Sequence, residues 1–293
     1  MTTVKASGTR DVPLEFAKKI NKLVNTELKE GTLFEKVTPI TKDLLMHWFD
    51  SRLSAERRIN FHEGQKQAIL NAIYIHEVLK AKNVFDMYMS VQPELLSEIG
   101  DIDLKKEKYS HKKYCIKMAT GTGKTWVLNA ILIWQYLNAK YSNNSENLYS
   151  KNFLLIAPGL IVYERLLDAY LGKEREDGTR DIEQSDFKRY EELFVPPMYR
   201  DEIFGFLNSS VVKKEEISRK VTGDGLIAIT NWHLLADYSS EVEETNALDN
   251  HRQVLRDIIP ILPGTSKGHE LNSLDYNYTK GKELEYLSNL PDL

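Results

Sequence analysis

The stretch Met118-Ala119-Thr120-Gly121-Thr122-Gly123-Lys124-Thr125 decides the fold of this chain. The apolar residues 114–118 lead into it and predict a strand, whereas the long apolar run 124–138 that follows predicts a helix. A glycine-rich loop between a strand and a helix, closed by Lys-Thr, is typical of a phosphate-binding loop, or P-loop. Glycine permits the tight turn that points main-chain N–H groups at phosphate oxygens, beside the positive end of the helix. We therefore predict nucleotide binding rather than a ligand-free strand–helix turn.

Each part of the loop has an expected role. The main chain of residues 120–123 surrounds the phosphates, and Lys124 reaches the β- and γ-phosphates. The hydroxyl of Thr125 ligates Mg²⁺. The predicted ligands are therefore ATP and Mg²⁺. One departure from the general pattern is Met118, which stands where the pattern has glycine.

The composition is that of a soluble globular protein. The 293 residues are 42% hydrophobic and 28% charged, enough for one large domain or two small ones. The net charge of -4 gives no overall attraction to nucleic acid, although a local groove can still be basic. The single cysteine, Cys115, falls in the predicted strand, and one buried thiol fits a reducing cytoplasm. The sequence shows no signal peptide and no membrane span.

The first part of the chain predicts helices. Residues 13–30 carry an apolar stripe, a second helix is expected over 42–53 with Thr41 as its cap, and a third over 64–80. The stripe of the first helix consists of Phe16, Ile20, Leu23, Val24 and Leu28. We interpret residues 1–60 as an N-terminal helical accessory segment.

The remainder alternates predicted strands and helices. The apolar run 153–157 ends at Pro158-Gly159, a helix is expected over 161–170, and a second buried strand over 226–230. Polar or charged stretches at 81–112, 172–192 and 237–282 are interpreted as insertions. This pattern predicts the α/β class, with a parallel sheet flanked by helices.

Four segments in a fixed order carry a resemblance to a known family. The family is that of superfamily 2 DEAD/DEAH-like DNA helicases, of the kind found in the Res subunit of type III restriction enzymes. The glutamine motif of this family resembles residues 61–69, motif I resembles 118–125, motif Ia resembles 155–161, and motif Ic resembles 227–233. The resemblance implies that residues 61–293 form an incomplete first motor domain, a RecA-like P-loop NTPase. It also implies double-stranded DNA as a partner, a second motor domain, and a nuclease or modification subunit.

The resemblance assigns further residues to ligands. Gln65 would read the adenine edge, although Gln67 offers an equivalent amide. Phe61 would either stack on the base or belong to the core. The family likeness further implies that Pro158, Gly159, Thr230 and Asn231 contact DNA phosphates at the carboxyl edge of the sheet.

The catalytic carboxylates of such an ATPase are not found in the sequence. An Asp-Glu pair should end an apolar strand, but Asp201-Glu202 follows Pro196-Pro197 and is not such a strand. We expect the chain to stop one strand short of this motif, with residues 290–293 as its lead-in. Beyond Lys124 no catalytic residue is assigned, and competent ATP hydrolysis is not expected.

Two other functions stay open at this point. One is a nucleotide-binding interaction module that never hydrolyses ATP. The other is a small P-loop kinase, whose lid would draw on Arg175, Arg180 and Arg189.

Overall fold

The computed structural model describes residues 12–99, 104, 106, 110–142, 148–217 and 219–231. The chain divides into two compact units, Met1–Leu148 and Tyr149–Leu293. The domain division predicted at residue 60 stays a prediction. The predictions for residues 237–282 and 290–293 fall outside the described residues, as do the last two residues of the segment 227–233.

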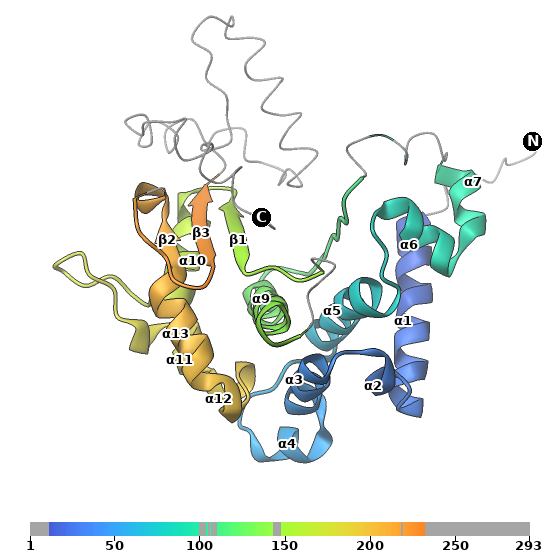
Figure 1. Cartoon of the computed structure of the whole chain (residues 1–293), viewed down its shortest axis with the longest axis horizontal. Helices are drawn as coiled ribbons and strands as arrows, with labels where there is room; N and C mark the ends of the chain where they lie inside the picture. The colour runs from blue at the N-terminus through green and yellow to red at the C-terminus, as the bar shows by residue number, and fades with distance from the viewer. Residues whose placement is uncertain are drawn as a thin grey trace, which may run out of the picture. The chain divides into compact units, whose positions relative to one another are not determined.

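All regular elements described in the first unit are helices (Figure 1). They are α1 (Val12–Glu30), α2 (Leu33–Lys36), α3 (Pro39–Phe49), α4 (Ser51–Glu56), α5 (Glu63–Ile73), the π-helix η1 (Tyr74–Val78), α6 (Val84–Val91), the 3-10 turn η2 (Pro93–Leu95), α7 (Leu96–Ile99) and α9 (Lys124–Tyr141).

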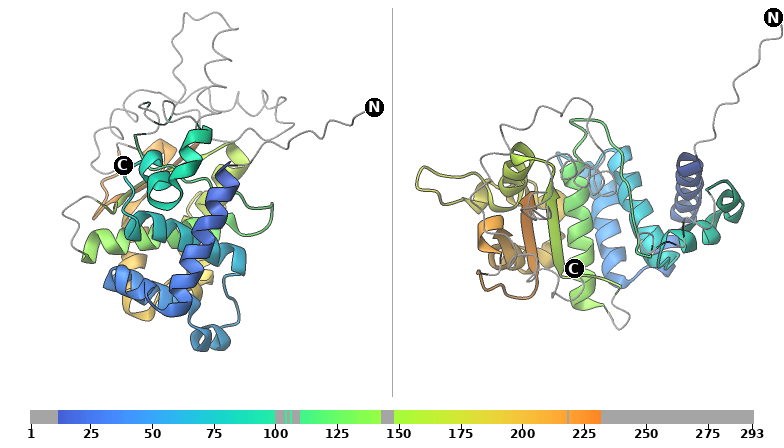
Figure 2. Two further views of the ribbon diagram at one scale, coloured as in Figure 1. Left: turned by 90° about the vertical axis from the view of Figure 1, so that its right-hand side faces the viewer. Right: turned by 90° about the horizontal axis from the view of Figure 1, so that it is seen from above.

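The first predicted helix is confirmed. In α1, Phe16, Ile20 and Val24 recur every fourth residue and are buried, because that spacing returns side chains to one helix face. This face packs against α5 and α6, and Figures 1 and 2 show α1 running beside both. One of its contacts joins the rings of Phe16 and Tyr88, whose centroids lie 4.4 Å apart.

The second predicted helix begins earlier than expected and is interrupted. Thr38, not Thr41, caps α3: its hydroxyl accepts a hydrogen bond from the Thr41 N–H, and Pro39 occupies the first turn. Proline suits that position because it has no N–H to leave unpaired. The helix ends at Phe49, where Asp50 caps the short α4.

A buried polar network joins three helices of the first unit. The carboxylate of Glu77, in η1, accepts hydrogen bonds from the hydroxyl of Thr41 in α3 (2.8 Å) and from the indole N–H of Trp134 in α9 (3.2 Å). Asn138 in α9 also donates to the Thr41 hydroxyl, at 3.0 Å. Partners for buried polar groups are required for stability, so this network fixes α9 against α3 and η1.

The segment predicted as the first insertion contains helices. Residues 81–112 include α6, η2 and α7, and their side chains Met87, Tyr88 and Leu95 are buried. These elements are short, so their apolar residues do not repeat often enough to show a period in the sequence.

The strand predicted just before the P-loop is not formed. Residues 112–119 have no regular structure, and Tyr114 and Ile116 are exposed. Cys115 is exposed as well, so the prediction of a buried thiol was wrong. A strand needs a neighbour to pair its N–H and C=O groups, and the described residues of this unit offer none.

The second unit contains a three-stranded parallel sheet, visible as adjacent arrows in Figures 1 and 2. Its elements are β1 (Asn152–Ala157), α10 (Leu160–Leu171), η4 (Ile182–Gln184), α11 (Asp186–Arg189), α12 (Glu191–Phe194), η5 (Pro197–Tyr199), α13 (Arg200–Ser210), β2 (Val211–Lys213), η6 (Lys214–Glu216) and β3 (Leu226–Asn231). The order is β1-β3-β2, and α10 and α13 pack on the sheet.

The sheet confirms the α/β prediction and the two strands predicted around residues 153–157 and 226–230. Every residue of β3 is buried, as expected for a central parallel strand. The register pairs Ala157 with Asn231, so β1 and β3 end at the same edge. Asp201 and Glu202 lie in the first turn of α13, which agrees with the exclusion of this pair as a strand-end motif.

The charged stretch 172–192 is only partly an exposed excursion. Its second half forms η4 and α11, and Phe187 is completely buried between the rings of Tyr170 and Phe194. Because most residues around Phe187 are charged, the sequence does not indicate that this side chain belongs to the core.

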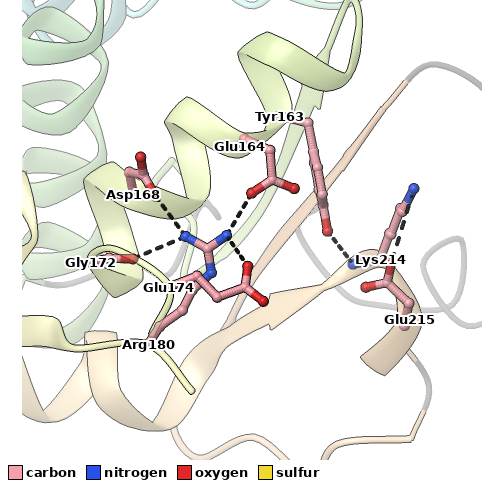
Figure 3. Close-up of polar contacts among 8 residues, drawn as sticks. All are labelled: Tyr163, Glu164, Asp168, Gly172, Glu174, Arg180, Lys214 and Glu215. Carbon is pink, nitrogen blue, oxygen red and sulfur yellow. Dashed lines mark hydrogen bonds and ion pairs between the residues drawn. The ribbon is translucent and has the colours of Figure 1, made fainter. Parts of the chain in front are cut away.

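Arg180 holds the first half of that stretch against α10 (Figure 3). Its guanidinium, with a side chain only 5% exposed, contacts the carboxylates of Glu164 (2.6 Å), Asp168 (2.7 Å) and Glu174 (3.2 Å). It also donates to the carbonyl of Gly172 at 3.0 Å.

In the described part of the chain, no helix is long and apolar enough to cross a membrane.

Candidate nucleotide-binding site

The P-loop has the backbone that phosphate binding requires. Gly121 and Gly123 adopt φ angles of 80° and 74°, in the left-handed region that favours glycine. A Cβ built on Gly121 would meet nothing within 4 Å, so the loop is open there. Gly123 precedes the 18-residue helix α9 and contributes no side-chain cap. The Trp126 N–H donates to the Gly123 carbonyl at 3.0 Å, which leaves the N–H groups of Lys124 and Thr125 in the first turn for a ligand.

Two polar side chains of the loop turn inward to one carbonyl. Lys124 Nζ donates to the main-chain oxygen of Ala119 at 2.8 Å, and the hydroxyl of Thr122 donates to the same oxygen at 2.7 Å. The ammonium group therefore lies within the loop rather than extending into solvent. A cation held in a glycine-rich loop at a helix N-terminus is a suitable environment for phosphate.

The loop fits a magnesium ion only as part of a magnesium–nucleotide complex. Thr125 is half-buried in the first turn of α9 and supplies one hydroxyl. Within the described ranges, no group of three or more His, Cys, Asp or Glu side chains could hold a metal ion alone. Mg²⁺ bound to phosphates needs only one or two protein ligands, because phosphate oxygens and water complete its octahedron.

Helix α5 begins with a reciprocal cap. The Nδ1 atom of His62 accepts hydrogen bonds from the N–H groups of Gly64 (3.2 Å) and Gln65 (3.3 Å). In return, Oε1 of Gln65 accepts the N–H of His62 at 3.0 Å. Such a capping box satisfies helix N–H groups that would otherwise have no partner.

The same two side chains contact the P-loop. His62 Nε2 lies 2.9 Å from the carbonyl oxygen of Thr122. Gln65 Nε2 lies 3.2 Å from that oxygen and 3.3 Å from the carbonyl oxygen of Gly123. The start of α5 is thus hydrogen-bonded to the last turn of the loop.

Gln65, predicted to bind adenine, lies beside the loop, where its amide is already hydrogen-bonded. Gln65 is 2% exposed, and both hydrogens of its amide nitrogen face loop carbonyls. Gln67 is engaged with Asn25 and Asn71. Phe61 is 9% exposed and meets the rings of Trp48, Phe49 and Trp126 edge-on. Phe61 was predicted either to stack on the base or to belong to the core, and these ring contacts correspond to the core role.

His62 is the residue that sequence reasoning missed. Histidine is not among the usual helix-capping residues, so its position just before α5 gave no capping signal. The one available sign was Gln65 three residues later, which is the second half of a capping box.

The predicted DNA-binding residues lie in the second unit. Pro158 and Gly159 connect β1 to α10, and Gly159 is the N-cap of that helix without a side-chain cap. Thr230 and Asn231 end β3 and are 0% and 2% exposed. Their assignment to DNA stays a prediction, as do the ligand roles of the P-loop residues.

Comparison with known proteins agrees with this arrangement. The model of the family "Type III restriction enzyme, res subunit" matches residues 58–250, which is more than half of the chain. No curated protein and no solved structure matches the chain. The matched range includes the start of α5, the P-loop and all three strands. The domain of this family is a P-loop, helicase-like, ATP-binding domain. The chain therefore belongs to the family of the type III restriction enzyme res subunit.

Proposed function

We propose that this chain binds Mg-ATP through residues 120–125, as the nucleotide-binding part of a superfamily 2 DNA helicase or translocase of the type III restriction kind. The observation that carries this proposal is the loop itself. Two left-handed glycines precede the N-terminus of α9, and the Lys124 ammonium is held in the same loop by the Ala119 carbonyl. Positive charge and main-chain N–H groups together favour the phosphates of a nucleotide.

A ligand that binds only the folded protein raises its melting temperature. Mg-ATP at a hundredfold excess over its dissociation constant should add about 2.7 kcal/mol to the free energy of unfolding. We expect a higher melting temperature with Mg-ATP than with adenosine, because the phosphates supply the contacts. Equal melting temperatures with and without Mg-ATP at millimolar concentration would argue against the proposal.

Adenine recognition by Gln65 is proposed separately, from the resemblance and from its place beside the loop. To reach a base, the amide must leave the carbonyls of Thr122 and Gly123. If it does, Gln65→Ala should narrow the ratio between ATP and GTP affinity, because discrimination arises from unpaired polar groups. An unchanged ratio removes Gln65 from this role.

We further propose that DNA phosphate binds at the N-terminus of α10. Gly159 has extended backbone, a Cβ there would meet nothing within 4 Å, and the first-turn N–H groups are open. Thr230 and Asn231 are buried, so Pro158 and Gly159 are the better candidates for direct contact. Such binding should tolerate any sequence and weaken steeply with salt.

A charge substitution at Gly159 tests the DNA proposal. Gly159→Asp and Gly159→Asn both supply a good helix cap, but only Asp adds a negative charge. Both caps occupy first-turn N–H groups, so both variants should bind a labelled duplex more weakly, as measured by anisotropy, but the Asp variant should lose more affinity because its charge also repels phosphate. Equal affinities for both variants would exclude phosphate at this helix end.

ATP hydrolysis by residues 1–293 is proposed to be very slow, since no Asp-Glu pair at a strand end was found in the sequence.

The kinase alternative has little to favour it. Arg180 is committed to three carboxylates, and Arg175 pairs with Asp181. A phosphate-release assay with and without duplex DNA tests both statements.

A further inference from the structure

We propose that His62 is a positioning residue of the P-loop, which orients the peptide between Thr122 and Gly123 so that its N–H faces the bound phosphates. The inference rests on the proposed nucleotide binding and adds a residue that neither the sequence motifs nor the family match singles out. It is carried by the hydrogen bonds of one imidazole ring.

The bonding of His62 fixes its tautomer. Two main-chain N–H groups, those of Gly64 and Gln65, donate to Nδ1, so this nitrogen carries no proton. The proton of the neutral ring is therefore on Nε2, which donates to the carbonyl oxygen of Thr122 at 2.9 Å. Because both nitrogens are engaged, the ring connects the first turn of α5 rigidly to the loop.

Peptide geometry converts this contact into an orientation. The peptide between Thr122 and Gly123 is trans, so its C=O and N–H groups point in opposite directions. His62 holds the C=O toward α5, and the Gly123 N–H consequently points away from α5, on the opposite side of the peptide. Gln65 does the same for the next peptide, since its amide holds the Gly123 carbonyl and turns the Lys124 N–H away.

These two N–H groups stand where α9 begins, and a phosphate at a helix N-terminus binds to such groups. Without the contact to His62, only the longer contact from Gln65, at 3.2 Å, holds the Thr122 carbonyl, and the peptide can rotate more freely because Gly123 tolerates a wide range of backbone angles. Phosphates would then bind more weakly, because part of the binding free energy would be used to order the loop.

Two variants separate the two functions of the ring. Asn at position 62 places an oxygen near Nδ1 and keeps the cap of α5, but it is too short to reach the Thr122 carbonyl. Gln at position 62 places a donor near Nε2 and keeps the loop contact, but it caps a helix poorly. Both side chains are uncharged, and His62 is exposed, so neither substitution disrupts a core.

The experiment measures two quantities for the full chain: the melting temperature without ligand, and the dissociation constants of Mg-ATP, Mg-GTP and inorganic tripolyphosphate. His62→Asn should melt like the parent protein but bind all three ligands about three- to tenfold more weakly, the scale of one neutral hydrogen bond. His62→Gln should melt at a lower temperature and bind them with nearly unchanged affinity.

Other outcomes would overturn the inference. If affinity follows the melting temperature across both variants, His62 is only a helix cap. If His62→Asn weakens ATP alone, its effect is on the base and not on the phosphate-binding loop. The proposed function fails differently, since in that case the parent protein binds none of the three ligands, or Lys124→Ala binds them as tightly as the parent.

Discussion

Gln65 and Gly123 are packed so closely that a Cβ on Gly123 would lie 2.3 Å from the amide nitrogen of Gln65. The glycine therefore serves two purposes: it accepts a φ of 74°, and it leaves room for a side chain that holds the loop.

Alanine substitutions at the two loop glycines separate these purposes. Gly121→Ala should cost about 1–2 kcal/mol of folding stability through the left-handed backbone alone, because a Cβ there meets nothing within 4 Å. Gly123→Ala adds a clash with Gln65 and should cost more, as measured by urea unfolding. The additional loss should shrink when Gln65→Ala is combined with it. Equal costs for the two glycines would show that the close contact is unimportant.

His76 should make the first unit less stable in acid. Burial, with a smaller contribution from the positive charge of Lys112, lowers the pKa of His76 from 6.5 to about 4. Between these values the unfolded chain binds a proton that the folded chain does not, so stability falls as pH falls through this window. The whole loss is on the order of 3 kcal/mol.

The comparison with His76→Gln isolates this effect from other titrating groups. Urea unfolding at pH 7.5 and pH 4.5 should show a larger loss for the parent protein than for the variant. If both proteins lose the same stability, His76 does not remain neutral inside the folded unit.

Arg180 should be essential to the second unit. Arg180→Met removes the buried guanidinium that three half-exposed carboxylates share, those of Glu164, Asp168 and Glu174. Because water screens these carboxylates, we expect a loss of about 1–2 kcal/mol of folding stability. The matched variant Arg175→Met removes an arginine of the same segment that is 56% exposed and pairs with Asp181, and it should have little measurable effect. Thermal unfolding of the two variants checks this; comparable losses would contradict the distinction.

Two asparagines of α9 should respond in opposite ways to replacement by leucine. Among the described residues, neither polar atom of the buried Asn129 amide has a hydrogen-bond partner, whereas Asn138 donates to Thr41 and to the Trp134 carbonyl. Asn129→Leu should therefore raise the free energy of unfolding by about 1–2 kcal/mol, and Asn138→Leu should lower it. A loss of stability in Asn129→Leu would indicate that this amide has a partner in the folded protein.

The sequence predicted the elements whose pattern is local. The repeat of Phe16, Ile20 and Val24 is visible along one helix, and the apolar runs in β1 and β3 are long enough to recognise. The glycines and Lys124 of the P-loop are informative for the same reason, since their roles follow from the backbone they require. By contrast, β2 is only three residues long, below the length at which an apolar run indicates a strand.

Other features depend on contacts between distant residues. Residues 114–118 form a mostly apolar run like that of a strand, but strand formation depends on a pairing partner that the residues themselves do not specify. The π-helical turn carries Glu77, whose partners Thr41 and Trp134 lie 36 and 57 residues away in the chain. The role of His62 was hidden similarly, because its partner, the Thr122 carbonyl, lies 60 residues away in the chain.

Calorimetric titration with Mg-ATP tests the central claim most directly. The parent protein should bind one nucleotide, and Lys124→Ala should lose about 1.5–3 kcal/mol of binding free energy, the scale of a charge-assisted hydrogen bond. Lys140→Ala, in the last turn of the same helix, is the control and should bind like the parent protein. Equal affinity in the Lys124→Ala and parent proteins would contradict the assignment of this loop as the nucleotide site.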